Sequence, residues 1–227
     1  MRVIRGRAAS IEADRAVTAA LREDVAESGE AAVRVWAPHR QIAFGRRDAR
    51  APGYARAREA AAEHEFPSYE RAVGGRAVAY TGTTLAFVRV TPLADVRRGM
   101  DERYDAAVAD VRRALSHLGV EAERGEPLHA FCPGDHSLSS RGKIVGIAQR
   151  VRKGAAQTAG CLVVDGHEEI AAVLTPIYEA LEVPFDPDSV GSLARAGGTA
   201  DVETARGTLE RALVGDEPIT VEEVRGV

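Results

Sequence analysis

The residues best suited to chemistry lie in one stretch, FCPGDHSLSSRGK, at residues 131–143. Cys132 stands in a Pro-Gly turn, which exposes a side chain and can aim backbone N–H groups at it. A cysteine becomes a nucleophile when a nearby cation or backbone dipoles stabilise its thiolate. Lys143 follows, and Lys143 and Lys153 are the only lysines in a chain whose other Lys+Arg positions are all arginine. This pattern makes Cys132 a candidate nucleophile and Lys143 a candidate proton-transfer group.

The neighbouring residues help to interpret Cys132. His136 is a second candidate cation close to it in the sequence. Cys161, by contrast, lies in the apolar run AGCLVVD and is predicted to be a buried, inert side chain. An unreactive turn cysteine, and lysines retained by accident in an arginine-rich composition, would produce the same spacing. The residues alone therefore leave both interpretations open.

The composition argues against several classes of protein. The chain has 227 residues, 45% of them hydrophobic and 28% charged, as in an ordinary soluble domain. A net charge of −4 argues against a nucleic-acid partner. No apolar run suits a signal peptide or a membrane span, and no Cys or His spacing suggests a metal site. We therefore expect a cytoplasmic protein with reduced thiols and no nucleic-acid or membrane partner.

Hydrophobic periodicity predicts helices interleaved with strands. Helices are expected at residues 10–29, 53–66, 101–119, 167–183 and 201–213. Strands are expected at residues 32–36, 41–44, 68–80 (broken by two glycines), 84–90, 143–151, 160–165 and 219–224. Regular alternation of strand and helix is missing, and the strands at 143–151 and 160–165 would pair as neighbours. The prediction is an α+β fold with a mixed or antiparallel sheet and flanking helices.

Helix-capping residues set several expected boundaries. Asp101 is expected to cap the helix with the clearest apolar stripe. That stripe consists of Tyr104, Val108, Val111, Leu115 and Leu118. Pro176 either kinks the helix at 167–183 or starts a second helix capped by Thr175. Asp201 is expected to cap the last helix.

Gly74 and Gly75, which follow Arg71, allow the backbone to approach another group closely. They form neither a GxGxxG motif nor a phosphate-binding loop, so they do not predict a nucleotide site. We expect the arginine pairs at 46–47, 97–98 and 112–113 to lie on the solvated surface.

Four segments resemble the family of lipoate–protein ligases and octanoyltransferases, which shares its fold with the biotin–protein ligase catalytic domain. They are WAPHRQIAFGRRD (36–48), RAVGGRAVAYTGTTLAFVRV (71–90), RGKIVGIAQRVRKGAAQTAGCLVV (141–164) and PFDPDSVGSLAR (184–195). The segment at 71–90 resembles the family's acyl-pocket hairpin, and the one at 141–164 carries its Gly-Lys-x-x-Gly-x-x-Gln motif. The resemblance implies that residues 1–227 form a single catalytic domain without a C-terminal accessory domain.

Within the family, the Cys-Pro-Gly turn is most similar to the branch that moves octanoyl groups between lipoyl domains. The resemblance makes Cys132 the nucleophile that forms an acyl-thioester, with Lys143 as the polarising or proton-transferring group. It assigns substrate binding to Arg71, Gly74, Gly75, Gly146 and Gln149. His136-Ser137 departs from the Tyr-Asp that this branch tends to have.

The implied reaction moves an octanoyl or lipoyl group from a donor to a lysine of a lipoyl-domain protein. Acceptors would be the glycine-cleavage carrier protein or the acyltransferase subunits of 2-oxoacid dehydrogenases, and no cofactor would be required. The alternative is an ATP- and Mg²⁺-dependent lipoate–protein ligase, working through lipoyl-AMP, with or without a separate accessory chain. Thr81-Gly82 stands where many ligases have His-Asp, which disfavours that alternative. A non-catalytic acyl-binding member of the fold is the third hypothesis.

Overall fold

The computed structural model describes residues 1–71 and 74–224, and the strands within them form two sheets. The larger sheet contains, in spatial order, β11 (Thr220–Glu223), β1 (Arg2–Arg5), β2 (Ala32–Trp36), β6 (Thr84–Leu93), β10 (Gly154–Val163), β9 (Lys143–Arg152), β8 (Leu138–Ser139) and β7 (Glu123–Arg124). The smaller sheet contains β4 (Ser68–Glu70), β3 (Gln41–Phe44) and β5 (Val78–Tyr80). The helices are α1 (Ile11–Ser28), α2 (Tyr54–Glu63), α3 (Met100–His117), α4 (His167–Ala180), α5 (Val202–Val214) and the short 3₁₀ helix η1 (Pro187–Ser189).

The larger sheet is mixed, as the sequence predicts. Strand β1 runs parallel to both β2 and β11, whereas β2, β6, β10 and β9 pair antiparallel in turn. The predicted pairing of the strands at 143–151 and 160–165 is confirmed, and β10 begins earlier than expected, at Gly154. The prediction of an α+β fold is therefore confirmed.

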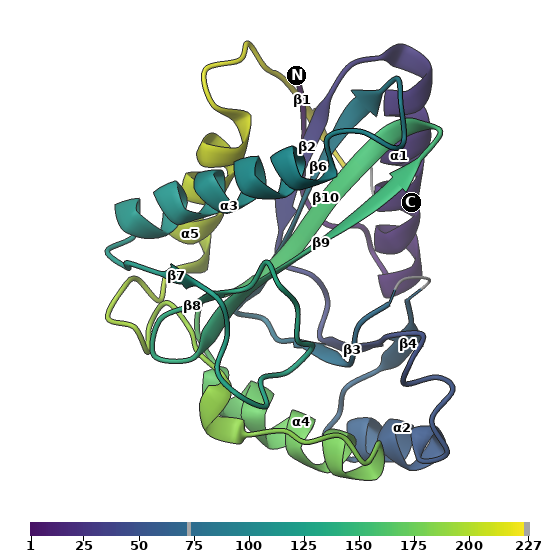
Figure 1. Ribbon diagram of the computed structural model, residues 1–227, viewed down its shortest axis with the longest axis vertical. Coiled ribbons are helices and arrows are strands. Elements are labelled where there is room, and N and C mark those ends of the chain that lie inside the picture. Colours follow the sequence, from purple (N-terminus) through teal and green to yellow (C-terminus); the bar gives the residue numbers. More distant parts are fainter. Residues whose placement is uncertain (72–73, 225–227) are drawn as a thin grey trace.

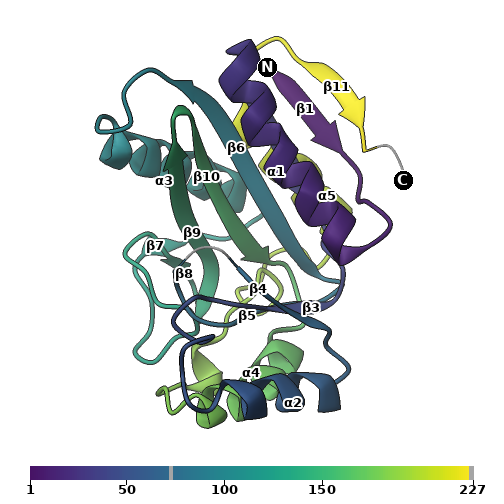
Figure 2. The ribbon, with the colours of Figure 1, turned by 90° about the vertical axis from the view of Figure 1, so that its right-hand side faces the viewer.

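Helices cover both faces of the larger sheet and the far side of the smaller one (Figures 1 and 2). Helix α1 packs on β6 and β10, while α3 and α5 pack on the opposite face. Successive side chains of β6 point to opposite faces of the sheet, which explains this arrangement. Val88 and Val90 face α1, whereas Leu85 and Phe87 face α3 and α5. Helices α2 and α4 pack together beneath the smaller sheet.

The expected hairpin at 71–90 is wrong. Strand β5 pairs with β3 in the smaller sheet, and β6 enters the larger sheet. The buried strand β3 also takes β4 on its other edge, so that both pieces of the predicted strand at 68–80 pair with it. A strand's residue pattern shows its burial but not its partner, which is why the sequence suggested the wrong pairing. Residues 72–73 of this segment lie outside the described residues.

Most predicted helix ends are confirmed, with two corrections. Helix α3 begins at Met100 after Gly99, whose carbonyl accepts the first helical hydrogen bond, so Asp101 lies in the first turn and does not cap it. Helix α4 is continuous through Pro176, and Thr175 bonds the carbonyl of Ala171 instead of capping a second helix. Burial of α4 side chains on both sides of the proline in one core holds the helix together.

The predicted α3 stripe is confirmed: Val108, Val111, Leu115 and Leu118 are buried and Tyr104 packs against them. Asp201 caps α5 as expected, with Oδ1 2.6 Å from the Thr204 amide nitrogen. None of the helices in the described part of the chain combines the length and apolarity needed to cross a membrane.

A buried ion pair fastens α1 to β2. The Arg34 side chain is 0% exposed, and its Nη2 lies 2.5 Å from Asp14 Oδ1. The other carboxylate oxygen of Asp14 accepts a 2.7 Å hydrogen bond from Trp36 Nε1. Burial lowers the pKa of Arg34, and the hydrogen bond and charge of Asp14 oppose that effect. The guanidinium therefore depends on this one carboxylate.

We expect Asp14→Ala to lower the free energy of unfolding by about 3–5 kcal/mol, because it leaves a buried charge without its partner. Urea unfolding measures the change. Asp24→Ala is the matched control: this exposed carboxylate lies 3.7 Å from Arg2 Nη1, and its loss should cost less than about 1 kcal/mol. Equal effects of the two substitutions would contradict the assignment.

Candidate active site

The thiol of Cys132 faces the segment that connects β4 to β5. Its Sγ lies 3.4 Å from the backbone nitrogen of Arg76 and 3.8 Å from Arg71 Nη2. Burial alone would lower the pKa of Arg71. The electrostatic interactions with Cys132 and Tyr80 outweigh burial, so the pKa of Arg71 is raised. An N–H donor and a fixed cation directed at sulfur are what stabilise a thiolate. The structure therefore places Arg71, which the resemblance assigns to substrate binding, beside the Cys132 thiol.

The backbone of Cys132 is held from both sides in an unusual conformation. Its φ of 41° lies in the left-handed region, which residues other than glycine rarely occupy. Its N–H donates to Tyr178 Oη at 2.7 Å, and the Tyr178 hydroxyl donates to the Ala77 carbonyl at 3.0 Å. Its carbonyl accepts a 2.7 Å hydrogen bond from Lys143 Nζ. These contacts overdetermine the position of the turn and with it the direction of the thiol.

Lys143 is buried beneath this turn, with a side chain 1% exposed. Its Nζ donates to Glu126 Oε2 at 2.8 Å, to the Phe131 carbonyl at 2.9 Å and to the Cys132 carbonyl at 2.7 Å. An ammonium group carries three N–H donors, so these acceptors use all of them. The structure thus brings Lys143 and Cys132 together through the Cys132 backbone.

Glu126 holds the loop that carries the cysteine, and it was not predicted from the sequence. Its Oε1 accepts from the Gly134 amide at 3.0 Å, and its Oε2 accepts from Ser137 Oγ at 2.8 Å as well as from Lys143. A carboxylate in a polar stretch looks like a solvated residue. The available signal was indirect: a buried lysine needs a carboxylate partner.

Asp48 supports the opposite side of the thiol and was also missed. It is 0% exposed; Oδ2 accepts from the Gly45 amide at 3.0 Å and Oδ1 from Arg76 Nη1 at 3.1 Å. The chain is tightly packed here, since a Cβ at Gly45 would lie 2.0 Å from the Gly75 carbonyl oxygen. A Cβ at Gly75 would lie 2.9 Å from Cys132 Sγ. Asp48 therefore fixes the segment whose N–H faces the sulfur.

The other predicted substrate-binding glycines surround this centre. A Cβ at Gly74 would meet no atom of residues 1–71 and 74–224 within 4 Å, so those residues leave its backbone open to an incoming group. Gly146 lies behind the turn, where a Cβ would approach Lys143 Cε to 3.6 Å and Cys161 Sγ to 3.9 Å. Cys161 itself is 6% exposed, and burial raises the pKa of its thiol. The predicted contrast between a reactive and an inert cysteine thus has a structural basis.

Two residues suggested by the sequence lie elsewhere. Gln149, further along β9, accepts a 2.9 Å hydrogen bond from Arg103 Nε and so packs against α3. His136 stacks on Tyr104, with centroids 3.6 Å apart, and its Nδ1 lies 2.6 Å from Arg124 Nη2. The interpretation of His136 as the cation beside the thiol is corrected, because the Pro-Gly turn directs it to the α3 side and Arg71 occupies that place.

Residues 1–71 and 74–224 contain no group of three or more His, Cys, Asp or Glu side chains that could hold a metal ion.

Comparison with known proteins places this site in a family. Residues 11–214 match the family model described as the lipoyl protein ligase A/B catalytic domain. The chain belongs to this family. It is 32% identical over 154 residues to an octanoyl-[GcvH]:protein N-octanoyltransferase of Exiguobacterium sibiricum, covering 66% of this chain and 55% of that protein. A protein of the same name from Oceanobacillus iheyensis is 26% identical, covering 77% and 66%. The chain thus spans only part of the length of these relatives.

Solved structures show the same fold at lower sequence identity. A lipoate–protein ligase A bound with ATP superposes with a TM-score of 0.74 at 18% identity, covering 99% of this chain and 88% of the other. The bi-partite lipoate–protein ligase of Thermoplasma acidophilum gives 0.67 at 18% identity, covering 98% and 86%. At these identities the likeness concerns the fold alone, and it agrees with the lipoate-ligase-like fold expected from the sequence.

In the folded protein we expect iodoacetamide to modify Cys132 and leave Cys161 intact, because only Cys132 is accessible and faces donors that stabilise a thiolate. Peptide mapping after brief labelling gives the site. Cys132→Ser should leave the folded protein unlabelled, and urea should expose Cys161. Comparable labelling of both cysteines without urea would contradict the assignment.

Asp48→Asn should slow alkylation of Cys132 between about tenfold and a hundredfold, because the amide cannot satisfy both the Gly45 N–H and the Arg76 guanidinium and the segment shifts. The alkylation rate is measured alongside urea unfolding, which separates a local shift from loss of the fold. Asp105→Asn is the control, since Asp105 is exposed and binds Arg124 at the surface. An unchanged rate in a folded Asp48→Asn protein would show that Asp48 does not position the thiol.

Proposed function

We propose that this chain is an octanoyltransferase that carries the acyl group as a thioester on Cys132 and passes it to a lysine of a lipoyl-domain protein. The observation that supports this most directly is the placement of an N–H donor and a partly buried guanidinium at the Cys132 sulfur. Family membership and the name of the curated relatives support the octanoyl group and the protein acceptor.

In the first step, the Cys132 thiolate attacks the carbonyl carbon of the donor's octanoyl group. The C–S bond forms, the bond from that carbon to the donor lysine nitrogen breaks, and the released amine takes up a proton. The Arg76 N–H and Arg71 Nη2 lie close enough to the sulfur to reach the oxygen that becomes negative on the same carbon. One such donor is worth about 2.7–4 kcal/mol in other acyl transfers.

In the second step, the acceptor lysine amine attacks the thioester. A C–N bond forms, the C–S bond breaks, the amine loses its proton, and the thiolate returns to its starting state. Dividing the transfer in two allows one site to serve two carrier proteins in turn. The relatives' name includes an octanoyl-[GcvH] donor, and we propose the glycine-cleavage carrier protein as donor here too. The proposed transfer uses no ATP and no metal.

Lys143 has a positioning role in this mechanism. The resemblance assigns it polarisation or proton transfer, but its three N–H donors are all occupied by acceptors that belong to the cysteine-bearing loop. We propose that it holds the Cys132 carbonyl and thereby the direction of the sulfur. Arg71 and the open backbone at Gly74 are the groups proposed to contact the acyl carbonyl.

Incubation with octanoylated glycine-cleavage carrier protein should give an octanoyl adduct without ATP, detected by intact mass and removed by hydroxylamine. Cys132→Ser should abolish the adduct and the transfer, whereas Cys161→Ser should retain both. Transfer that persists in Cys132→Ser would contradict the thioester. If labelling of the acceptor instead required ATP together with free octanoate or lipoate, the result would favour the ligase. Binding of the acyl ligand without any adduct would favour the non-catalytic acyl-binding hypothesis.

A further inference from the structure

Three arginines that follow β3 are exposed and have no carboxylate partner. Arg46, Arg47 and Arg50 take part in no ion pair or side-chain hydrogen bond within the described part of the chain. Several other arginines are paired; Arg89, for instance, binds Asp110 at 2.5 Å. The sequence expectation that 46–47 is solvated is confirmed, but solvation does not explain why three like charges gather here without forming an ion pair.

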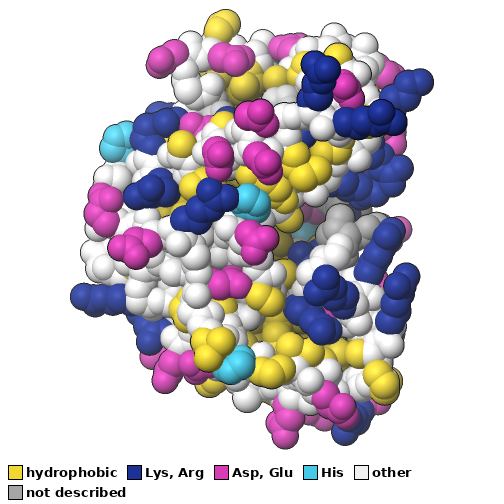
Figure 3. Space-filling view, in the orientation of Figure 1, with side chains coloured by type: hydrophobic (Ala, Val, Ile, Leu, Met, Phe, Trp, Pro, Cys, Tyr) yellow, Lys and Arg dark blue, Asp and Glu magenta, His cyan; other side chains and the backbone are white. Residues whose placement is uncertain are grey.

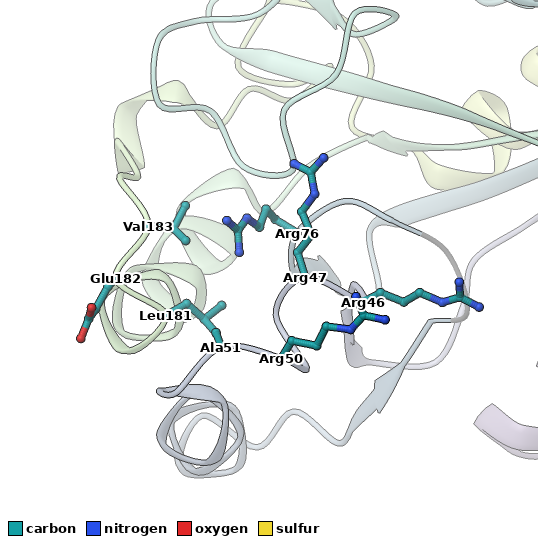
Figure 4. Close-up of a pocket in the computed structure, with 8 residues that line it drawn as sticks. All are labelled: Arg46, Arg47, Arg50, Ala51, Arg76, Leu181, Glu182 and Val183. Carbon is teal, nitrogen blue, oxygen red and sulfur yellow. The ribbon is translucent and has the colours of Figure 1, made fainter.

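These arginines line one side of a hollow of about 420 Å³. Arg76 completes that side, and the opposite side is formed by the end of α4 and the residues after it, Leu181, Glu182 and Val183 (Figure 4). The space-filling view shows basic side chains gathered beside an apolar hollow in the lower right of that face (Figure 3). The surface thus combines charged arginine side chains with the apolar side chains of Leu181 and Val183.

The hollow is connected to the reactive sulfur through Arg76. The backbone nitrogen of Arg76 lies 3.4 Å from Cys132 Sγ, while its side chain lines the hollow and is held by the buried Asp48. Arg76 is therefore the residue that the surface formed by Arg46, Arg47 and Arg50 shares with the surroundings of the sulfur.

We propose that Arg46, Arg47 and Arg50 form the docking surface for a carrier domain whose acyl-bearing lysine is flanked by carboxylates. The proposal rests on the proposed function, which requires a donor and an acceptor protein to reach Cys132 in turn. Charge complementarity selects an acidic partner, since the chain as a whole has a net charge of −4 yet is locally basic here. Guanidinium groups suit carboxylate pairing, and exposed charges of this kind accelerate encounter.

The test compares two octanoyl donors for the triple variant Arg46→Gln, Arg47→Gln and Arg50→Gln. One is octanoylated glycine-cleavage carrier protein, and the other is the small uncharged thioester octanoyl-N-acetylcysteamine. Formation of the Cys132 adduct should slow roughly tenfold or more with the carrier at low salt and less than twofold with the small donor. Raising the salt concentration should slow the carrier reaction of the wild type far more than that of the variant.

The matched control removes the same charge elsewhere, with Arg97→Gln, Arg112→Gln and Arg152→Gln. These side chains are also exposed and unpaired in the described part of the chain, and lie at the β6–α3 connection, on α3 and at the end of β9. This control should keep the carrier rate within about twofold of wild type, because these arginines do not line the hollow.

Two results would overturn the docking proposal. One is a triple variant that keeps the carrier rate and its salt dependence. The other is an equal loss with both donors, or equal inhibition of both by inorganic phosphate, which would assign the arginines to a small-anion site. Failure of the wild type to form any adduct with either donor would instead contradict the proposed function, so the two failures can be distinguished.

Discussion

One buried ammonium group fixes the reactive part of this structure. Lys143 Nζ converges on a carboxylate oxygen of Glu126 and on the carbonyls of Phe131 and Cys132. A lysine suits this place because its three donors radiate from one atom, whereas an arginine presents a flat fork. Burying the charge costs several kcal/mol unless its partners are complete, which ties the loop conformation to this pair. A chain whose only other lysine is Lys153 therefore has a physical reason for lysine here.

The thiol stands where two separate hydrogen-bond networks meet. Lys143 and Glu126 set the backbone of Cys132, while Asp48 sets the segment whose N–H reaches the sulfur. The two networks arise from opposite sides, one from β9 and the cysteine-bearing loop and the other from the residues after β3. Because both networks form without substrate, the groups proposed to stabilise charge are already in place, and little reorganisation would accompany the proposed reaction.

Most local features of the fold could be predicted from the sequence, whereas the pairing of distant strands and the partners of charged side chains could not. Asp201 caps its helix as expected because the Thr204 amide that it accepts from lies three positions away, whereas the cap expected at Asp101 was wrong. The partner of β5 could not be predicted, since pairing depends on a distant strand. Cys132 and Lys143 stood out by residue type and motif. Glu126 and Asp48 did not, because a charged loop residue looks solvated until the fold surrounds it.

The left-handed backbone conformation at Cys132 costs stability at the position of the proposed nucleophile. At a φ of 41° a residue with a Cβ is strained by about 1–3 kcal/mol, and glycine is the residue that avoids this cost. The backbone here would thus be most relaxed in a protein without the proposed nucleophile. Selection for folding alone would tend to replace the cysteine with glycine. The proposed chemistry of the Cys132 sulfur would account for keeping a strained residue at this position.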